Sequence, residues 1–365
     1  MKRTLLTVAA LTSLLALSVP LAKATTTMAS GIVAQDPTPE EAAAYKLWFD
    51  ANNAKDYAKA MELAKAYLEK FPTGKYAPYL KDKWIPSMDP FFFNEAVKAK
   101  NMPEIIRIGK GVLARDPENL DFIWAVLLQI RQNELSASPP NFGHASDAVD
   151  LTQRAIKLFE GGKTLTGADP KTFKLNVTLG YLHQTLALIY DNNKDTDKAL
   201  AAYTKAAELD PTNVSYFFHS GRIYNDRYNV AAQKYDAAQK KADALSDADR
   251  NAADSKPEVK AVLEEAKAAL AEVKGRAEPV INYWVRYLGL TADKPSDART
   301  TVLSVVSGLY KFLNNNSEEG LTKLIEENKT SPTPVKMSPP TPQAAAQPKA
   351  PEPAAPGKPN GKKPR

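Results

Sequence analysis

The feature that most constrains this chain is a pattern of large and small residues within residues 180–213. The residues that carry the pattern are Leu186, Ala187, Tyr190, Ala199, Tyr203, Ala206 and Pro211. They recur at about one helical turn on either side of a polar stretch, so the pattern predicts two helices that pack along their apolar faces. Small Ala187 and Ala199 predict a close approach of the two helices, and Pro211 predicts the end of the second one.

This segment resembles a tetratricopeptide repeat, which is a 34-residue pair of antiparallel helices. With Gly180 as the first position, the seven residues named above stand where the family pattern requires them. His183 departs from the pattern, because it replaces the usual large apolar residue at the fourth position. The resemblance implies an all-α fold of stacked helix pairs, and it implies protein binding as the activity.

Weaker versions of the pattern extend the resemblance upstream. Residues 41–72 match it in part, with Trp48 in place of a small residue, and they are similar to divergent repeats of bacterial envelope-assembly proteins. Two further helix pairs are expected over residues 91–117 and 120–161. No segment alternates polar and apolar residues for long enough to predict a strand. We therefore expect an all-α chain.

The pattern changes downstream of residues 180–213, which we call the strong repeat. A further repeat starts at Val214, and its second helix is expected from about Ala231. Apolar and small residues then recur at three- and four-residue steps on both sides of a polar break at residues 246–257. This spacing predicts a long antiparallel helical hairpin over residues 229–289, although a pair of ordinary core helices would give nearly the same pattern. Two shorter helices are expected over residues 297–328.

The two ends of the chain have other compositions. The start combines a basic Lys2-Arg3 pair, an uncharged apolar stretch and a small-x-small cleavage site, which predicts a signal peptide; an uncleaved anchor is the alternative. The end holds 11 of the 27 prolines, which predicts a disordered basic tail that favours polyproline II. The expected organisation is a signal peptide at 1–24, a linker at 25–40, repeats at 41–228, the hairpin and C-terminal helices at 229–329, and the tail at 330–365.

Composition excludes several classes of function. The chain has no cysteine, so disulfides and thiolate metal sites are excluded. Its net charge of +6 comes from the two ends, which leaves the body mildly acidic and without an attraction for nucleic acid. The only histidines, His144, His183 and His219, share no metal-ligand spacing, and no nucleophile elbow or phosphate-binding loop occurs. We therefore expect no enzyme activity, no metal and no cofactor.

The resemblance also implies a groove lined by the first helix of each pair. In that family, the second, fifth, ninth and twelfth positions of first helices commonly face the groove. The residues that the resemblance places there are Tyr45, Phe49, Tyr181, Gln184, Leu188, Phe218, Arg222 and Asn225. Their chemistry is aromatic with amides and one cation, so we expect an apolar or helical protein ligand. Interior packing or plain surface is the alternative for each residue.

Together these features predict an exported, non-enzymatic scaffold that holds other proteins together in the cell envelope. We expect it to be periplasmic or secreted, and soluble after cleavage of the signal peptide. Two alternatives stay open. One is a binder of an envelope polymer or anionic surface that acts through the basic tail, and the other is an accessory subunit of an envelope enzyme.

Overall fold

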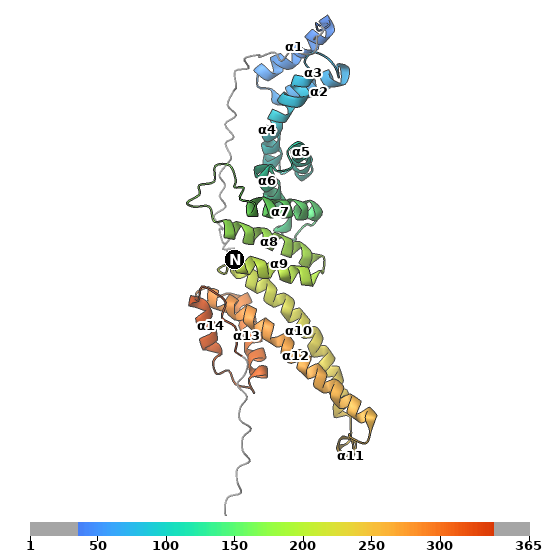
Figure 1. The fold of residues 1–365 in the computed structure, drawn as a ribbon, viewed down its shortest axis with the longest axis vertical. Helices are drawn as coiled ribbons and strands as arrows, with labels where there is room; N and C mark the ends of the chain where they lie inside the picture. The colour runs from blue at the N-terminus through green and yellow to red at the C-terminus, as the bar shows by residue number, and fades with distance from the viewer. Residues whose placement is uncertain (1–35, 339–365) are drawn as a thin grey trace, which may run out of the picture. The chain divides into compact units, whose positions relative to one another are not determined.

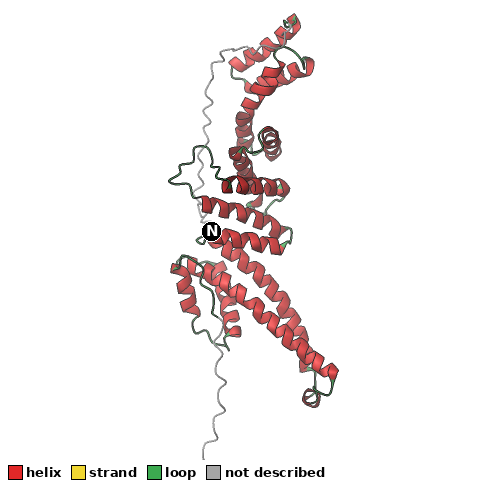
Figure 2. Cartoon of the chain, viewed as in Figure 1, coloured by secondary structure: helices red, strands yellow, loops and turns green. Residues whose placement is uncertain are grey.

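The computed structural model describes residues 36–338, and every regular element in that range is a helix (Figure 1). Figure 2 shows the same helices with their connecting loops. The expected all-α class is confirmed. The expected signal peptide, most of the linker and residues 339–365 of the expected tail lie outside the described residues. No helix within the described range has the length and apolar composition needed to cross a membrane.

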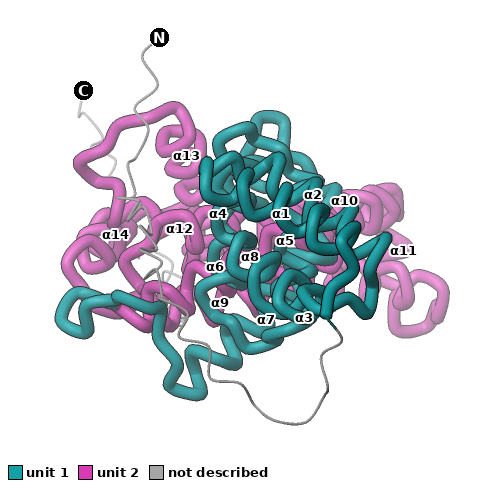
Figure 3. Tube along the Cα trace, turned by 90° about the horizontal axis from the view of Figure 1, so that it is seen from above, with its two compact units in different colours: residues 1–173 teal, residues 174–365 magenta. Residues whose placement is uncertain are grey.

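The chain divides into two units, residues 1–173 and 174–365, which Figure 3 distinguishes by colour. In the first unit, α1 packs on α2, α4 on α5, and α6 on both α5 and α7. Its elements are α1 (Pro39–Asn53), α2 (Tyr57–Lys70), α3 (Ala77–Tyr79), η1 (Leu80–Trp84), α4 (Ile85–Lys98), α5 (Met102–Arg115), α6 (Leu120–Ile130), η2 (Arg131–Leu135) and α7 (Ala145–Glu160).

In the second unit, α8 packs on α9, α9 on α10, and α10 on α12, while α13 and α14 both pack on α12. Its elements are α8 (Leu175–Asn192), α9 (Thr196–Leu209), α10 (Val214–Asp243), α11 (Asp247–Asn251), α12 (Pro257–Leu290), α13 (Asp297–Leu313) and α14 (Leu321–Thr330). The two helices expected over residues 297–328 are therefore present.

One turn geometry joins α1 to α2, α4 to α5, and α8 to α9. In each turn a lysine adopts a positive φ, and the next residue is an Asp or Asn whose side chain caps the second helix. The three lysines are Lys55, Lys100 and Lys194. A proline follows each lysine after the same interval of 17 positions, at Pro72, Pro117 and Pro211. Three helix pairs in the two units are therefore built on one local framework.

The structure corrects the interpretation of the repeat that starts at Val214. Its first helix does not end before Ala231; instead α10 runs unbroken for 30 residues. No proline or glycine lies between Asn225 and Ala231 to end it. The helix that packs along α10 is α12, so the long hairpin is present but begins at Val214 (Figure 1). The expected domain boundary at residue 228 falls inside α10.

The packed body also extends past residue 330, where the tail was expected to begin. Residues 331–338, which we call the C-terminal strap, return to the body. Met337 is buried, and its backbone N–H donates to Asn282 Oδ1 at 2.7 Å. Val335 exchanges two hydrogen bonds with the buried Asn328 side chain, at 2.8 and 3.0 Å. The boundary at residue 330 is therefore too early.

A buried arginine links the strap to the tetratricopeptide-like segment. Arg286 of α12 is 1% exposed, and burial lowers the pKa of its guanidinium. Its Nη1 donates to the carbonyl oxygens of Asn328 and Ser331, and its Nη2 donates to that of Pro211, each at 2.8 Å. These carbonyls lie at or just beyond the C-terminal ends of α9 and α14, where helix dipoles favour positive charge. One side chain therefore joins α9, α12, α14 and the strap.

Candidate partner-binding surface

The strong repeat packs through small residues on its two helices. Four of the seven pattern residues have no exposed surface: Ala187, Ala199, Tyr203 and Ala206. Leu186 is buried, whereas Tyr190 and Pro211 are half-buried. Gly180 also allows a close approach, because a Cβ there would lie 3.3 Å from the carbonyl oxygen of Ala206. The contact between α8 and α9 thus depends on side chains that are small or absent.

Side chains connect α8 to α10, the next first helix. Gln184 is buried, and its Nε2 donates to Ser215 Oγ at 2.8 Å. Arg222 forms ion pairs with Asp191 of α8 and, at 3.1 Å, with Asp226 of its own helix. The Arg222 guanidinium is therefore held by two carboxylates. Its charge is already compensated before any partner arrives.

The predicted groove residues of the second unit differ in their surroundings. Tyr181, Leu188 and Asn225 are half-buried. Phe218 is also half-buried, but its ring packs on Tyr287 of α12 with 5.3 Å between centroids. Part of the Phe218 ring therefore belongs to the interface of the hairpin. This contact with Tyr287 supports the alternative interpretation of Phe218, which is interior packing.

An exposed residue of α8 was missed by sequence reasoning. Val177 is 43% exposed and lies one helical turn before Tyr181. The 34-residue frame counts from Gly180, whereas α8 begins five positions earlier at Leu175. Extending the apolar spacing back from Tyr181 would have found Val177. One side of α8 therefore carries exposed Val177 and half-buried Tyr181 and Leu188 in succession, and we call these three residues the α8 face.

The histidine next to Phe218 is kept neutral. His219 stacks on Tyr203, with 5.4 Å between ring centroids and 3° between ring planes. Burial lowers its pKa, and the positive charge of Arg222 lowers it further, while Asp191 acts in the opposite direction. Its Nδ1 is buried without a hydrogen-bond partner. The surroundings of His219 therefore favour packing over proton transfer.

The two groove residues predicted in the first unit lie on α1, in an aromatic cluster. Tyr45 is half-buried and stacks on Tyr76 at 3.8 Å, whereas Phe49 is 46% exposed. Tyr79 of α3 joins them, is 42% exposed, and was missed by sequence reasoning. All three rings that reach the surface pack around buried Trp48. We call Tyr45, Phe49 and Tyr79 the α1–α3 aromatic face.

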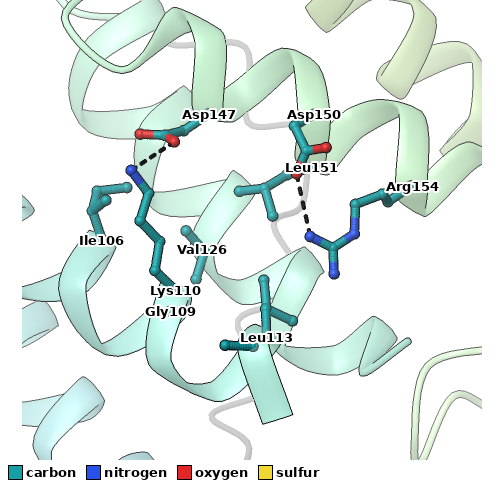
Figure 4. Close-up of a pocket in the computed structure, with 10 residues that line it drawn as sticks. Ile106, Gly109, Lys110, Leu113, Val126, Asp147, Asp150, Leu151 and Arg154 are labelled. Carbon is teal, nitrogen blue, oxygen red and sulfur yellow. Dashed lines mark hydrogen bonds and ion pairs between the residues drawn. The ribbon is translucent and has the colours of Figure 1, made fainter. Parts of the chain in front are cut away.

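A pocket of about 190 Å³ lies between α5, α6 and α7 (Figure 4). Its lining includes the apolar side chains of Ile106, Leu113, Val126 and Leu151. Two ion pairs also line it, Lys110 with Asp147 at 2.9 Å and Arg154 with Asp150 at 3.2 Å. Both carboxylates are therefore neutralised. Among residues 36–338, no three His, Cys, Asp or Glu side chains gather in a metal-binding arrangement.

Comparison with known families assigns the segment formed by α8 and α9. Residues 180–213 match the family model described as the tetratricopeptide repeat. The chain therefore contains a tetratricopeptide repeat, a module that generally binds other proteins and does not catalyse reactions. A comparison with curated proteins gave no match.

Proposed function

We propose that this chain is an exported, non-enzymatic scaffold that holds other proteins in the cell envelope, in the periplasm or outside the cell. The observation that carries the proposal is the α8 face, because it places exposed and half-buried apolar side chains along one side of the first helix of a tetratricopeptide repeat. The order of charge, apolar stretch and small-x-small site in residues 1–24 supports export.

The chemistry of the α8 face favours an apolar or helical partner. Val177 and Leu188 offer aliphatic surface, and Tyr181 adds a ring with a polar tip. Arg222 is compensated by Asp191 and Asp226, so a partner gains little from placing a carboxylate there. Binding should therefore depend on apolar contact more than on ion pairing.

The test is capture of a partner from envelope extract, followed by mass spectrometry of cross-linked peptides. The double variant Val177→Ser/Leu188→Ser should lose at least ten-fold in capture, while its helix content by circular dichroism stays unchanged. Lys205→Ala is the control, because Lys205 is an exposed residue of α9 outside the face. Cross-links should map to α8. Equal capture by the double variant and the control would contradict the proposal.

The same experiment examines the alternative function of the basic tail. A chain that ends after Ser338 lacks the basic tail segment but keeps the C-terminal strap. If that deletion abolished capture while the α8 variants retained the partner, the tail would be the binding element. Binding through the tail should also weaken as salt rises, because exposed charges are screened.

Export has its own measurement. N-terminal sequencing of the protein recovered from the envelope or the medium should begin near Thr25. An intact Met1 on the exported protein would contradict cleavage of a signal peptide.

A further inference from the structure

The α1–α3 aromatic face leaves two rings exposed above one buried indole. The ring centroids of Tyr45, Phe49 and Tyr79 lie 4.9, 6.3 and 5.9 Å from that of Trp48, which is only 1% exposed. Phe49 and Tyr79 both contact this indole, so their centroids are at most about 12 Å apart. Adjacent exposed rings of this kind usually mark a binding surface.

The rings are held in place from beneath. Trp48 packs edge-on against Trp84 at 5.2 Å, and the Trp84 Nε1 donates to Asn52 Oδ1 at 2.9 Å. Tyr45 stacks on Tyr76 at 3.8 Å with 15° between the ring planes. A ligand would therefore meet rings that are already ordered, which reduces the entropy lost on binding.

The face also offers hydrogen-bond donors. Tyrosine hydroxyls are protonated at neutral pH, and burial raises the pKa of Tyr45 further, to about 12, with contributions from Tyr79 and Tyr76. A polyproline II ligand has backbone carbonyls without internal partners, and tyrosine hydroxyls can donate to them. Aromatic surfaces with such donors are the usual recognition sites for proline-rich segments.

The chain itself contains a segment with this chemistry. Residues 339–365 hold nine prolines, and four pairs of them are three positions apart. Residues three positions apart in polyproline II project on the same side, about 9 Å from each other, which lies within the upper limit of about 12 Å on the distance between the Phe49 and Tyr79 ring centroids. The pairs are Pro339 with Pro342, Pro348 with Pro351, Pro353 with Pro356, and Pro356 with Pro359.

We propose that the α1–α3 aromatic face binds the proline-rich segment 339–365 of this chain. Prolines three positions apart would pack on Phe49 and Tyr79, and the backbone between them would accept hydrogen bonds from the tyrosine hydroxyls. Every molecule that carries the face also carries this segment, so the two are present at equal concentration. The α8 face takes no part, so this proposal stands whether or not that face holds a partner.

The test measures binding of a fluorescein-labelled synthetic peptide of residues 339–365 by fluorescence anisotropy. The receptor is the full-length chain with its nine tail prolines replaced by serine, so that its own tail does not compete. A second labelled peptide carries the same proline-to-serine changes and has the same charge. Titrations are repeated at about 1 M salt, where charge interactions are screened beyond about 3 Å.

The wild-type peptide should bind saturably both at low salt and at about 1 M salt. The serine peptide should bind at least ten-fold more weakly. In the receptor, Phe49→Ala and Tyr79→Ala should each weaken binding at least ten-fold, whereas Tyr79→Phe, which keeps the ring, should lose less. Phe91→Ala is the control, because Phe91 is an exposed ring on α4 outside the face. Melting temperatures establish that each variant is folded.

Three results would overturn the proposal. They are the absence of saturable binding by the wild-type peptide, equal binding by the two peptides, and an equal loss in the Phe91→Ala control. The second result would show that the segment binds through its lysines and not through its prolines.

Discussion

Trp284 of α12 lies directly against Gly221 of α10. A Cβ on Gly221 would come within 2.2 Å of Trp284 Cδ1. The indole has little freedom to retreat, because its Nε1 donates to the carbonyl oxygen of Phe218 at 3.1 Å. The contact between the two longest helices therefore depends on a missing side chain.

Replacing Gly221 by alanine should destabilise the protein by about 1–3 kcal/mol, because the added methyl group overpacks the contact with Trp284. Gly275→Ala is the matched control, since a Cβ on Gly275 of α12 would meet no atom within 4 Å. The control should gain roughly 0.5–1 kcal/mol from helix propensity. Chemical denaturation measures both variants, and equal shifts would contradict the close contact.

Ala199→Leu examines the crossing of α8 and α9. Ala199 has no exposed surface, so the larger side chain should cost about 1–3 kcal/mol. Lys205→Leu changes an exposed position of the same helix and should shift the free energy of unfolding by at most about 0.5 kcal/mol. Equal melting temperatures for the two variants would argue against the repeat packing.

Arg286→Met should destabilise the second unit by roughly 3 kcal/mol, because it removes a buried guanidinium from three backbone carbonyls. Arg276→Met is the comparison within α12. Arg276 makes one exposed ion pair with Glu272 at 3.7 Å, so its loss should cost about 0.5 kcal/mol. Urea denaturation followed by circular dichroism distinguishes the two, and a small effect at Arg286 would show that its hydrogen bonds add little.

Two truncations separate the C-terminal strap from the tail. A chain that ends after Thr330 loses buried Met337 and the hydrogen bonds of Val335, and it should be destabilised by about 2–4 kcal/mol. A chain that ends after Ser338 keeps all of these contacts and should unfold like the full chain. Calorimetry measures the difference, and identical melting of both truncated chains would leave the strap without a stabilising role.

The pKa of His219 gives a pH dependence with a defined sign. Its pKa in the folded protein is below the ordinary value of 6.5, through burial and Arg222, so the unfolded chain takes up the proton first. The contribution of neutral His219 to the free energy of unfolding is complete above pH 6.5, and it falls as the pH drops below that value. His219→Phe keeps the stacking on Tyr203 but cannot be protonated. The variant should therefore lose less stability than the wild type between about pH 7.5 and 5.5.

The contacts that sequence reasoning found are local, and most of the contacts that it missed join distant segments. The pattern from Leu186 to Pro211 lies within one helix pair, so its spacing alone predicts a close approach at Ala187 and Ala199. Ala231 and Ala238 also keep the spacing of a second repeat helix, but the same spacing serves the seam between α10 and α12. Periodicity alone does not distinguish these two uses.

The boundary of the tail was misplaced for a similar reason. Pro332 and Pro334 give residues 331–338 the composition of the tail, and tertiary contacts such as that of Met337 with Asn282, 55 positions earlier, show that they are packed. Phe218 likewise meets Tyr287 across a long separation in sequence. The recurring turns were also hidden, because lysine is not a residue that favours positive φ.

The hairpin has a further property. Five of its buried positions on α12 recur every seven residues, at Val259, Ala266, Val273, Val280 and Tyr287. Removing seven residues from each arm would therefore shorten it by about 10 Å and leave the remaining seam in register. The pairs that share the lysine turn instead have one fixed interval of 17 positions from the lysine to the proline. The seam of the hairpin is therefore compatible with changes of length in steps of seven residues, whereas the second helices of the three lysine-turn pairs share one length.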